Sequence, residues 1–377
     1  MTTATLNATP GSLSPAFEAC TYRGGVGVID QLADEWRQLC EEAEDHQPFF
    51  RPEWFRAHIR VFLPRARVLL VAVRRGGRLC LVLPLVEERG TYSKVPIRKL
   101  RAPVNVHGGR FDATCAGGAD GNIAIATAWN CLAQLDSWDI LQICNVPSGS
   151  NVVRIVAAAK ATGLRALVVP DRPSPYVRVP PDPLLLQGMP PNSKLRSQLR
   201  RARVRLSEQG DLTFYCVGVA DQNQLERFYL LERSGWKGKA GSAILCNGSR
   251  PFYDEIAKAA ARFGYFLLFM LELNGRLLAA HFSFVLNRCC FSPIVAYDEA
   301  FKLYAPGHLI VGEIVKYCAE RGIHCFDITG QDQSWKMKWT SESLAINNYF
   351  VFRGPLGQLA YGIGSGLRSA AGLFHKT

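Results

Sequence analysis

Apolar positions in the second half of the chain alternate between the spacing of strands and the spacing of helices. Three strand-like runs come first, with the tight-turn pair Asn274-Gly275 between the first two, and a helix-like run and a last strand follow. An antiparallel meander that leads into a helix and a returning strand predicts a mixed α/β sheet. A helix that starts facing such a sheet suits a cofactor that carries phosphate. The segments are, in order, residues 265–273, 276–286, 289–297, 304–322 and 323–330.

The first half of the chain shows a related order. A helical stretch at residues 28–45 is followed by a hairpin whose turn, Gly76-Gly77-Arg78-Leu79, returns later as Asn274-Gly275-Arg276-Leu277. Trp138-Asp139-Ile140 has a counterpart in Phe326-Asp327-Ile328. We interpret these pairs as two related α/β halves that arose by duplication. Chance similarity is the alternative, because Gly-Arg hairpins are common.

Composition divides the chain into two domains of ordinary size, joined by a proline-dense linker. The first residues are rich in Thr, Ser, Ala and Pro, and we expect them to be disordered. The expected segments are a lead at residues 1–16, an N-terminal domain at 17–175, a linker at 176–192, a C-terminal domain at 193–353 and a tail at 354–377.

Hydrophobic residues make up 48% of the 377-residue chain and charged residues 20%, which indicates a soluble globular protein. The apolar runs are too short to span a bilayer, and the N-terminus lacks the basic and apolar regions of a secretory signal. We therefore expect a cytoplasmic protein. Twelve cysteines are scattered without a Cys-x-x-Cys pair, and the seven histidines form no His-x-x-x-His pair. This pattern predicts reduced thiols and no metal site.

Forty-four basic and 32 acidic residues give a formal charge of +12, which favours anionic partners. The densest basic stretch, residues 192–206, has six cations and no acid, and Asn192 or Ser193 is a suitable N-cap for a helix there. The cations form either a solvated helix face or a surface that meets a cofactor phosphate or an acidic glycan. An apolar stripe runs along this helix at Leu195, Leu199, Ala202 and Leu206.

Three residues in or near apolar segments are candidates for chemistry. Trp236 and Lys237 lie among glycines, which predicts a mobile loop in which Trp236 stacks on a sugar or acyl group and Lys237 meets an anion. A loop that the tryptophan merely anchors is the alternative. His281 lies in an apolar strand and has the pKa range of a general base, although a structural hydrogen-bonding role also fits a lone strand histidine.

Asp327 is the strongest acidic candidate, because a carboxylate in an apolar strand costs free energy unless it is paired or takes part in chemistry. Pairing with Lys336 is the structural alternative. Asp298 lies at the end of the preceding strand. The helix that follows opens at residues 304–308, and its free backbone amides suit a pyrophosphate, although every helix has such an end.

In this order the segments resemble the GNAT-like acyltransferases of the BioF2-like or cellulose-biosynthesis CelD family. The resemblance spans residues 25–345. It rests on the basic helix SKLRSQLRRARVRL, the loop GWKG, and the segments LNGRLLAAHFSF, AYDEAFKLYAPGHLIVGEIVKYCAERG and FDITGQDQSWKMKW, with PFFRPEWFRAHI, RVLLVAVRRGGRLCLVLPL and SWDILQICNVPSGS upstream.

The resemblance implies two tandem GNAT-like α/β domains with mixed (α+β) sheets, an acyl-CoA such as acetyl-CoA as co-substrate, and an amine acceptor. GNAT chemistry is direct attack of the amine on the thioester, and the sequence has no nucleophile triad. One departure is the loop KLYAPGHL, which has a single glycine where ordinary GNAT enzymes are glycine-rich. The implied site residues are Asp327, His281 and Glu232 for catalysis; Ala305, Pro306, Gly307, His308 and Leu309 for the cofactor; and Trp236, Lys237, Tyr297, Asp298 and Lys336 for the substrate.

The expected function is N-acyl transfer, most simply acetyl transfer, to an amino sugar of an exopolysaccharide or cell-surface glycan precursor, with no specific nucleic acid as partner. A Fem-like transferase that uses aminoacyl-tRNA is one alternative, although no long charged helical hairpin is visible in the second half. A non-catalytic regulatory subunit of polysaccharide synthesis is another. The tail has no acidic residue, which fits a weak interfacial helix at the inner face of the membrane, a signalling-nucleotide site or a frayed terminus.

Overall fold

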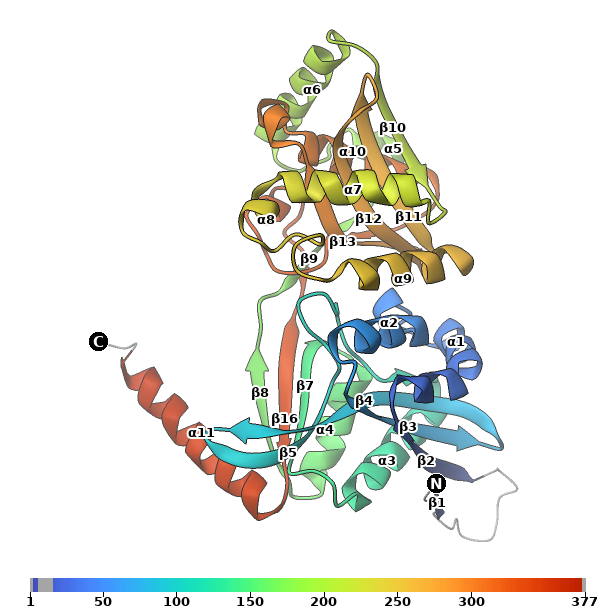
Figure 1. Cartoon of the computed structure of the whole chain (residues 1–377), viewed down its shortest axis with the longest axis vertical. Coiled ribbons are helices and arrows are strands. Elements are labelled where there is room, and N and C mark those ends of the chain that lie inside the picture. Colours follow the sequence, from blue (N-terminus) through green and yellow to red (C-terminus); the bar gives the residue numbers. More distant parts are fainter. Residues whose placement is uncertain (1–2, 6–15, 375–377) are drawn as a thin grey trace. The chain divides into compact units, whose positions relative to one another are not determined.

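The computed structural model describes residues 3–5 and 16–374, which form two compact units (Figure 1). Unit 1 comprises Met1–Asp171 together with Ala345–Thr377, and unit 2 comprises Arg172–Leu344. The disordered lead expected from the sequence lies largely outside the described residues.

Unit 1 is built around one mixed sheet. Its strands follow the order β1-β2-β3-β4-β5-β7-β16-β8, and β6 pairs with β4. The neighbours are antiparallel except for β5 and β7, which are parallel. The strands are β1 (Thr3–Thr5), β2 (Phe17–Gly24), β3 (Arg67–Arg75), β4 (Arg78–Tyr92), β5 (Val95–Arg101), β6 (Thr114–Cys115), β7 (Ile140–Pro147), β8 (Arg165–Pro170) and β16 (Ile346–Phe352).

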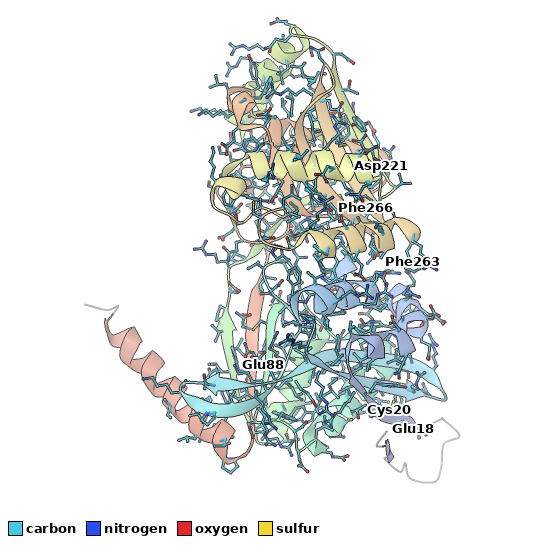
Figure 2. All side chains as sticks on the ribbon, viewed as in Figure 1. Glu18, Cys20, Glu88, Asp221, Phe263 and Phe266 are labelled. Carbon is cyan, nitrogen blue, oxygen red and sulfur yellow. The ribbon has the colours of Figure 1, made fainter. Side chains whose placement is uncertain are left out.

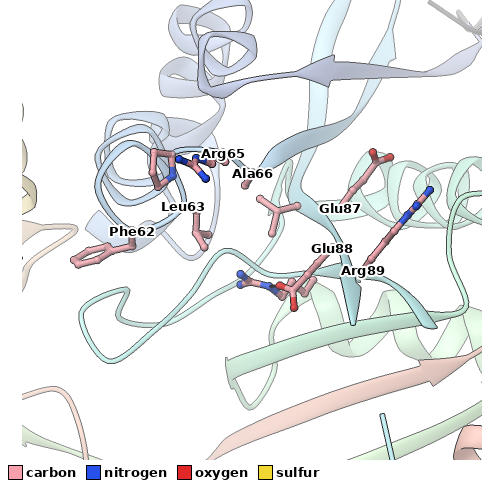
Figure 3. A pocket seen from close by; sticks show the side chains of 10 residues that line it. Phe62, Leu63, Arg65, Ala66, Glu87, Glu88 and Arg89 are labelled. Carbon is pink, nitrogen blue, oxygen red and sulfur yellow. Dashed lines mark hydrogen bonds and ion pairs between the residues drawn. The ribbon is translucent and has the colours of Figure 1, made fainter. Parts of the chain in front are cut away.

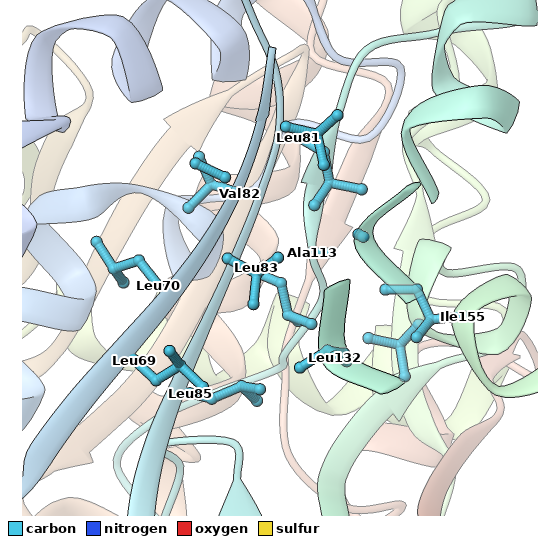
Figure 4. Close-up of a cluster of buried hydrophobic side chains, with 14 of the residues drawn as sticks. Leu69, Leu70, Leu81, Val82, Leu83, Leu85, Ala113, Leu132 and Ile155 are labelled. Atoms are coloured by element: carbon cyan, nitrogen blue, oxygen red, sulfur yellow. The ribbon is translucent and has the colours of Figure 1, made fainter. Parts of the chain in front are cut away.

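Helices cover both faces of this sheet, with α1 and α2 on one face and α3 and α4 on the other (Figure 1). The central strands β3 and β4 are therefore buried along nearly continuous apolar runs, as strands covered on both faces are. Figure 4 shows part of this core, in which Leu83 of β4 and Leu132 of α3 are fully buried. The helices are η1 (Val26–Gln31), α1 (Ala33–Glu42), η2 (Pro48–Phe50), α2 (Pro52–Phe62), α3 (Gly118–Gln134), α4 (Asn151–Ala161) and α11 (Gly354–Phe374).

Unit 2 contains a second mixed sheet, with the strand order β10-β11-β12-β13-β14-β9-β15. The one parallel pair in it is β13 with β14, and the other neighbours are antiparallel. The strands are β9 (Ser174–Arg178), β10 (Leu212–Val217), β11 (Phe266–Leu273), β12 (Arg276–Leu286), β13 (Cys289–Tyr297), β14 (Cys325–Asp327) and β15 (Ser343–Leu344).

The sheet of unit 2 is likewise covered on both faces. Phe282 of β12 contacts Phe228 of α7 and Tyr253 of α9, with ring centroids 5.8 and 5.6 Å apart. The register pairs Phe269 of β11 with the residue before Phe282, and successive side chains of a strand point to opposite faces. Phe269 therefore lies on the other face of the sheet, where it contacts Tyr317 of α10. The helices are α5 (Pro183–Leu186), α6 (Ser193–Ser207), α7 (Gln222–Ser234), α8 (Trp236–Lys239), α9 (Arg250–Arg262), η3 (Glu299–Tyr304), α10 (Pro306–Glu320) and η4 (Lys336–Lys338).

Local sequence explains where α6 and α7 begin. The side chain of Asn192 accepts a hydrogen bond from Leu195 N at 2.9 Å, and Asp221, labelled in Figure 2, accepts one from Gln224 N at 2.9 Å. Each bond satisfies a backbone amide that the helix leaves free. The stripe expected on α6 is its buried face, as predicted: Leu195, Leu199, Ala202 and Leu206.

Each unit contains a strand from the other half of the chain. β9 follows β8 in sequence but lies in the sheet of unit 2, between β14 and β15, whereas β16 follows β15 but lies in the sheet of unit 1, between β7 and β8. Apart from β1 and β6, the two sheets then have the same order, and the parallel step falls at the same place, β5–β7 in one and β13–β14 in the other. This common plan supports the duplication inferred from the sequence.

The boundaries expected from the sequence need correction at two places. Residues 174–178, divided there between the N-terminal domain and the linker, form β9 of unit 2. Residues 345–353, assigned there to the C-terminal domain, belong to unit 1 because β16 pairs with both β7 and β8. The helix expected at residues 28–45 is instead η1 followed by α1, with Leu32 between them at φ −117°.

Among the described residues, no helix has the length and apolarity needed to cross a membrane. The same part of the chain contains no group of three or more His, Cys, Asp or Glu side chains arranged to hold a metal ion.

Candidate functional site

Strand β13 carries a bulge. Its register with β12 shifts between Phe282 and Phe284, where Ser292 and Pro293 of β13 lie opposite a single residue of β12. Proline has no N–H to donate, so it is tolerated within a sheet mainly at such irregular positions. A bulge bends its strand and is frequent beside active sites.

Beyond the bulge, β13 loses its neighbour β14. Residues Cys289–Phe291 pair with Cys325–Asp327, and β14 ends there. Within the described chain, residues 292–297 have no strand paired on that side. We call this backbone the open edge of β13. An open edge is where an extended ligand adds like a further strand.

The hydrogen bonds to β12 determine which groups face the open edge. Asp298 N donates to Leu278 O at 2.8 Å, so these two residues form a hydrogen-bonded pair. Hydrogen-bonded and non-hydrogen-bonded pairs alternate along antiparallel strands, so the pair Ala280–Ala296 is hydrogen-bonded and the pairs on either side of it are not. Val295 belongs to one of these non-hydrogen-bonded pairs. It therefore directs its N–H and C=O away from β12, toward the open edge.

An ion pair between a buried glutamate and a half-buried lysine lies against this edge. Glu232 Oε1 of α7 lies 3.2 Å from Lys237 Nζ of α8, and the Glu232 side chain is 2% exposed. Glu232 Oε2 accepts a hydrogen bond from Ile244 N at 2.9 Å. Lys237 Nζ also donates to Val295 O at 3.4 Å. Residues 63 positions apart in the chain thus place an acid, a cation and a free backbone amide together.

His281 is fully buried, and burial, reinforced by the charge of Lys237, lowers the pKa of His281 to about 3. Its Nδ1 lies 2.6 Å from Ser292 Oγ, which accepts a hydrogen bond from Ser283 Oγ at 3.1 Å. The Ser292 hydrogen is then directed at Nδ1, which leaves the imidazole proton on Nε2. Nε2 has no hydrogen-bond partner in the described part of the chain. This geometry favours a neutral imidazole that can donate through Nε2, and the general-base role expected for His281 stays a prediction.

Helix α10 begins after β13 with a turn that no side chain caps. Ala305 adopts a left-handed conformation, with φ 50°, and Pro306 follows at the first helical position. The amides of His308 and Leu309 both donate to Ala305 O, at 2.9 and 3.0 Å. Among first-turn amides of the described helix, Gly307 N–H has no acceptor. Of the first-turn amides expected to bind a pyrophosphate at residues 305–309, only that of Gly307 is therefore available in the described helix.

Two further residues of this region are held by packing. Trp339 Nε1 donates to His308 Nδ1 at 2.9 Å, and burial lowers the pKa of His308 to about 4. The ring of Tyr297, 37% exposed, lies 3.3 Å from the position that a Cβ on Gly307 would take. Glycine thus allows the helix start to approach the end of β13.

Asp327 and Lys336 meet at one turn. Asp327 Oδ1 accepts a hydrogen bond from Thr329 N at 2.8 Å, and Lys336 Nζ donates to Thr329 O. Both side chains are buried. The carboxylate of Asp327 is thus engaged in shaping the turn after β14, which favours the structural interpretation of this residue.

Asp298 is held by its own partners, and Trp236 lies on a helix. Asp298 caps the first turn of η3, and its Oδ2 lies 2.6 Å from Arg276. Trp236, 56% exposed, lies on the short helix α8 where a mobile loop was expected. A Cβ at Gly238 would collide with Arg233 O, so the tight step from α7 to α8 depends on glycine.

The cations of α6 divide into two groups. Arg196 donates to carbonyl groups of the preceding turn, and Arg203 pairs with Glu313 of α10. The remaining four are exposed and form no ion pair within the described residues: Lys194, Arg200, Arg201 and Arg205. A solvated face and an anion-binding surface both remain open for them.

A groove of about 440 Å³ lies elsewhere, in unit 1 (Figure 3). Its carboxylates are already paired, Glu87 with Arg67 at 3.1 Å and Glu88 with Arg101. None of the residues that the sequence singles out lines it. The candidate site is therefore the open edge of β13 and the residues around it.

The chain is similar to known proteins in part of its sequence and in its fold. Residues 193–337 match the family model of the acetyltransferase (GNAT) domain. Among solved structures, FemX is 13% identical with a TM-score of 0.59, and the match covers 88% of this chain and 98% of that one. The C-terminal DUF2156 domain of an Agrobacterium fabrum protein that carries the name lysylphosphatidylglycerol synthetase is 10% identical with a TM-score of 0.52, over 90% of this chain and 96% of that one. No curated protein sequence matches the chain.

At these identities the likeness concerns the fold. The fold class expected from the sequence, α/β with two tandem GNAT-like domains and mixed sheets, is confirmed by the domain match and by the two mixed sheets. The matched stretch lies within unit 2 and contains β13, α10 and the Glu232–Lys237 pair.

Sequence reasoning missed Val295, Ser283 and Ser292. The role of Val295 depends on the direction of its backbone N–H, and the roles of Ser283 and Ser292 depend on their position beside a histidine. Neither feature produces a recognisable sequence motif. Pro293 is the one available signal, because a proline inside a strand-like run predicts an edge or a bulge.

Proposed function

We propose that the protein is an acyl-CoA-dependent N-acyltransferase that transfers its acyl group, most simply acetyl, to an amino sugar of an exopolysaccharide or cell-surface glycan precursor. The observation that carries this proposal is the open edge of β13, with Val295 N–H free beside the ion pair Glu232–Lys237 and the uncapped start of α10.

The donor would bind along the open edge. The arm of coenzyme A is an extended chain with amide groups, and such a chain pairs with a strand edge through main-chain hydrogen bonds. Its pyrophosphate would meet Gly307 N–H and the positive end of the α10 dipole. The corresponding helix of unit 1, α3, carries Asp120 in its first turn, and this carboxylate already occupies Arg75 at 2.5 Å, so an anion would compete with it there. This contrast supports unit 2 as the donor-binding unit.

The reaction would proceed by direct attack. The acceptor nitrogen bonds to the thioester carbon, the C–S bond breaks, and the thiolate of coenzyme A leaves. Val295 N–H would stabilise the oxygen on which negative charge develops, since a fixed donor at that position lowers the barrier. His281 Nε2–H is a second fixed donor close to the bulge. It replaces the base role expected from the sequence.

The proton of the attacking amine needs an acceptor. Asp327 and Glu232 each accept a hydrogen bond from a backbone amide, so position decides between them, and the pKa of His281 is only about 3. Glu232 is the buried carboxylate that lies against the open edge through Lys237, so we assign the proton transfer to Glu232, from which the leaving thiolate recovers it. The exposed indole of Trp236 on neighbouring α8 would give a flat surface for a sugar ring.

Release of the coenzyme A thiol tests this proposal. The full chain is incubated with short and long acyl-CoAs and a panel of amino sugars, and thiol is measured against time. We expect release that depends on both the acyl-CoA and one class of amino sugar. Binding of acyl-CoA without turnover on any amine would favour the regulatory alternative.

Consumption of aminoacyl-tRNA without any use of acyl-CoA would instead favour the Fem-like alternative. The exposed cations of α6 are the observation that keeps this alternative open, because unpaired surface cations suit a phosphate backbone.

A further inference from the structure

The C-terminal helix α11 leaves an apolar face uncovered. Its first turns pack on unit 1, where Ala360 is buried and the ring of Tyr361 lies 5.1 Å from that of Phe352. Beyond these turns the helix extends away from the sheet (Figure 1). Three large apolar side chains on the described part of this helix are substantially exposed: Leu356 at 43%, Leu359 at 53% and Ile363 at 40%.

These three residues begin a stripe that continues in the sequence. Their spacings of three and four residues place them on one side of a helix. Leu367, Ala370 and Phe374 follow at spacings of four, three and four, so apolar residues recur along the whole of α11. Six apolar positions in register over a 21-residue helix form the pattern of an amphipathic helix.

The composition of this segment indicates what covers the stripe. Residues 354–377 contain Arg368 and Lys376 but no aspartate or glutamate, and the remaining positions are largely Gly, Ser and Ala. Exposed Arg165, whose guanidinium lies 5.1 Å from the Tyr361 ring, adds a cation beside the first turns. An apolar face flanked by cations and small polar residues suits the interface of an anionic bilayer.

We propose that α11 is a membrane-docking helix that lies in the plane of an anionic lipid surface and inserts the stripe begun by Leu356, Leu359 and Ile363. Charge distinguishes this occupant from a second copy of the chain. Two chains of formal charge +12 repel one another, whereas an anionic surface attracts each of them. The helix would hold the transferase at a lipid surface and takes no part in the chemistry at β13.

Vesicle co-sedimentation of the full chain tests this inference. Vesicles of phosphatidylcholine alone are compared with vesicles that also contain phosphatidylglycerol. The test variant combines Leu359→Gln with Ile363→Gln. The matched control combines Leu184→Gln with Leu185→Gln on α5, which are 72% and 59% exposed and remove two apolar side chains away from α11.

We expect the wild type and the control to sediment with the phosphatidylglycerol vesicles, and the α11 variant to partition about tenfold less. Thiol release in lipid-free solution should be the same in all three, which keeps this test separate from that of the proposed function. Circular dichroism and cooperative thermal unfolding confirm that the variant is folded.

Three outcomes overturn the inference. The first is a wild type that stays in the supernatant with anionic vesicles, and the second is an α11 variant that sediments as the wild type does. The third is a wild-type dimer in sedimentation velocity, without lipid binding, that the α11 variant converts to a monomer. That result would assign the stripe to a second copy of the chain.

Discussion

Burial of the Glu232 carboxylate costs free energy, and two contacts offset that cost: the ammonium of Lys237 at 3.2 Å and the amide of Ile244 at 2.9 Å. Truncation of either partner leaves a buried charge incompletely solvated. The sequence singled out Glu232 only through a family resemblance and Lys237 also through the glycines around it, because a Glu-Arg-Ser-Gly-Trp-Lys run has no periodicity that shows the burial of Glu232.

Replacement Glu232→Gln tests this pair. The amide side chain still accepts from Ile244 N but carries no charge for Lys237, so we expect unfolding to become easier by about 1–3 kcal/mol and the rate of acyl transfer to fall about 100-fold or more. Urea unfolding and thiol release are the measurements. Glu299→Gln is the matched control, because Glu299 pairs with Lys239 at 2.6 Å on the surface and should leave both quantities unchanged. Equal effects of the two replacements would contradict the assignment.

His281 predicts a pH dependence of stability. The folded protein keeps this imidazole neutral down to a pKa of about 3, whereas an unfolded histidine binds a proton below about 6.5. The unfolded state therefore binds more protons between these values, and stability falls as the pH is lowered from 6.5 toward 3. In His281→Asn this contribution is absent.

Urea unfolding of the wild type and His281→Asn at pH 4 to 6 measures the difference. We expect the wild-type stability to fall more steeply, by about 1.4 kcal/mol per pH unit for one proton. His58 and His308, whose pKa values burial also lowers to about 4, act in the same direction in both proteins. Parallel curves would show that His281 is protonated in the folded chain.

Among the secondary-structure elements, those with strong local patterns were predictable. The stripe on α6, the hairpin β11–β12 at Asn274-Gly275 and the helix α10 follow from spacing and turn residues alone. The helix expected at residues 28–45 is interrupted because the chain folds into a 3-10 turn before Leu32. The bulge of β13 depends on how this strand pairs with β12, so the direction of the Val295 N–H could not be predicted from the sequence.

Val295→Pro removes the proposed donor from the open edge. Val295 N–H does not bond to β12, so the substitution removes no rung of that ladder. We expect the protein to fold and kcat to fall about 100- to 1,000-fold, the usual effect of losing one such donor. Thermal unfolding and steady-state kinetics measure the two quantities.

The neighbouring replacement Ala296→Pro is the control for this experiment. Ala296 belongs to a hydrogen-bonded pair with Ala280, so proline there removes a ladder bond and should destabilise unit 2 more than Val295→Pro does. If Val295→Pro unfolds the protein and Ala296→Pro does not, the direction assigned to these backbone groups is wrong.

For the molecule as a whole, the reciprocal placement of β9 and β16 is the feature that the sequence could not provide. Each strand pairs with strands of the other half that are far away in the sequence. Composition and periodicity give no information on which distant strands pair. The proline-dense stretch before α6 resembles a linker, yet it includes most of β9. The duplication was visible in the hairpins, whereas the exchange of last strands was not.

The exchange predicts which fragment folds. Residues 172–344 contain every strand of the second sheet in one continuous segment. Residues 193–353, the domain expected from the sequence, lack β9 and carry β16 without β7 and β8. We expect cooperative thermal unfolding, followed by circular dichroism, for the first fragment and not for the second. Equal cooperativity of both fragments would argue against the exchange.

Hydrogen exchange of the full chain with and without acetyl-CoA is the most direct measurement of the donor site. If unit 2 binds the donor along the open edge, protection should concentrate in residues 292–309, which include Val295 and Gly307. The corresponding region of unit 1, residues 95–120, should not change, because Asp120 lies at its helix start. Protection in residues 95–120, or none in residues 292–309 at saturating acetyl-CoA, would contradict the proposed site.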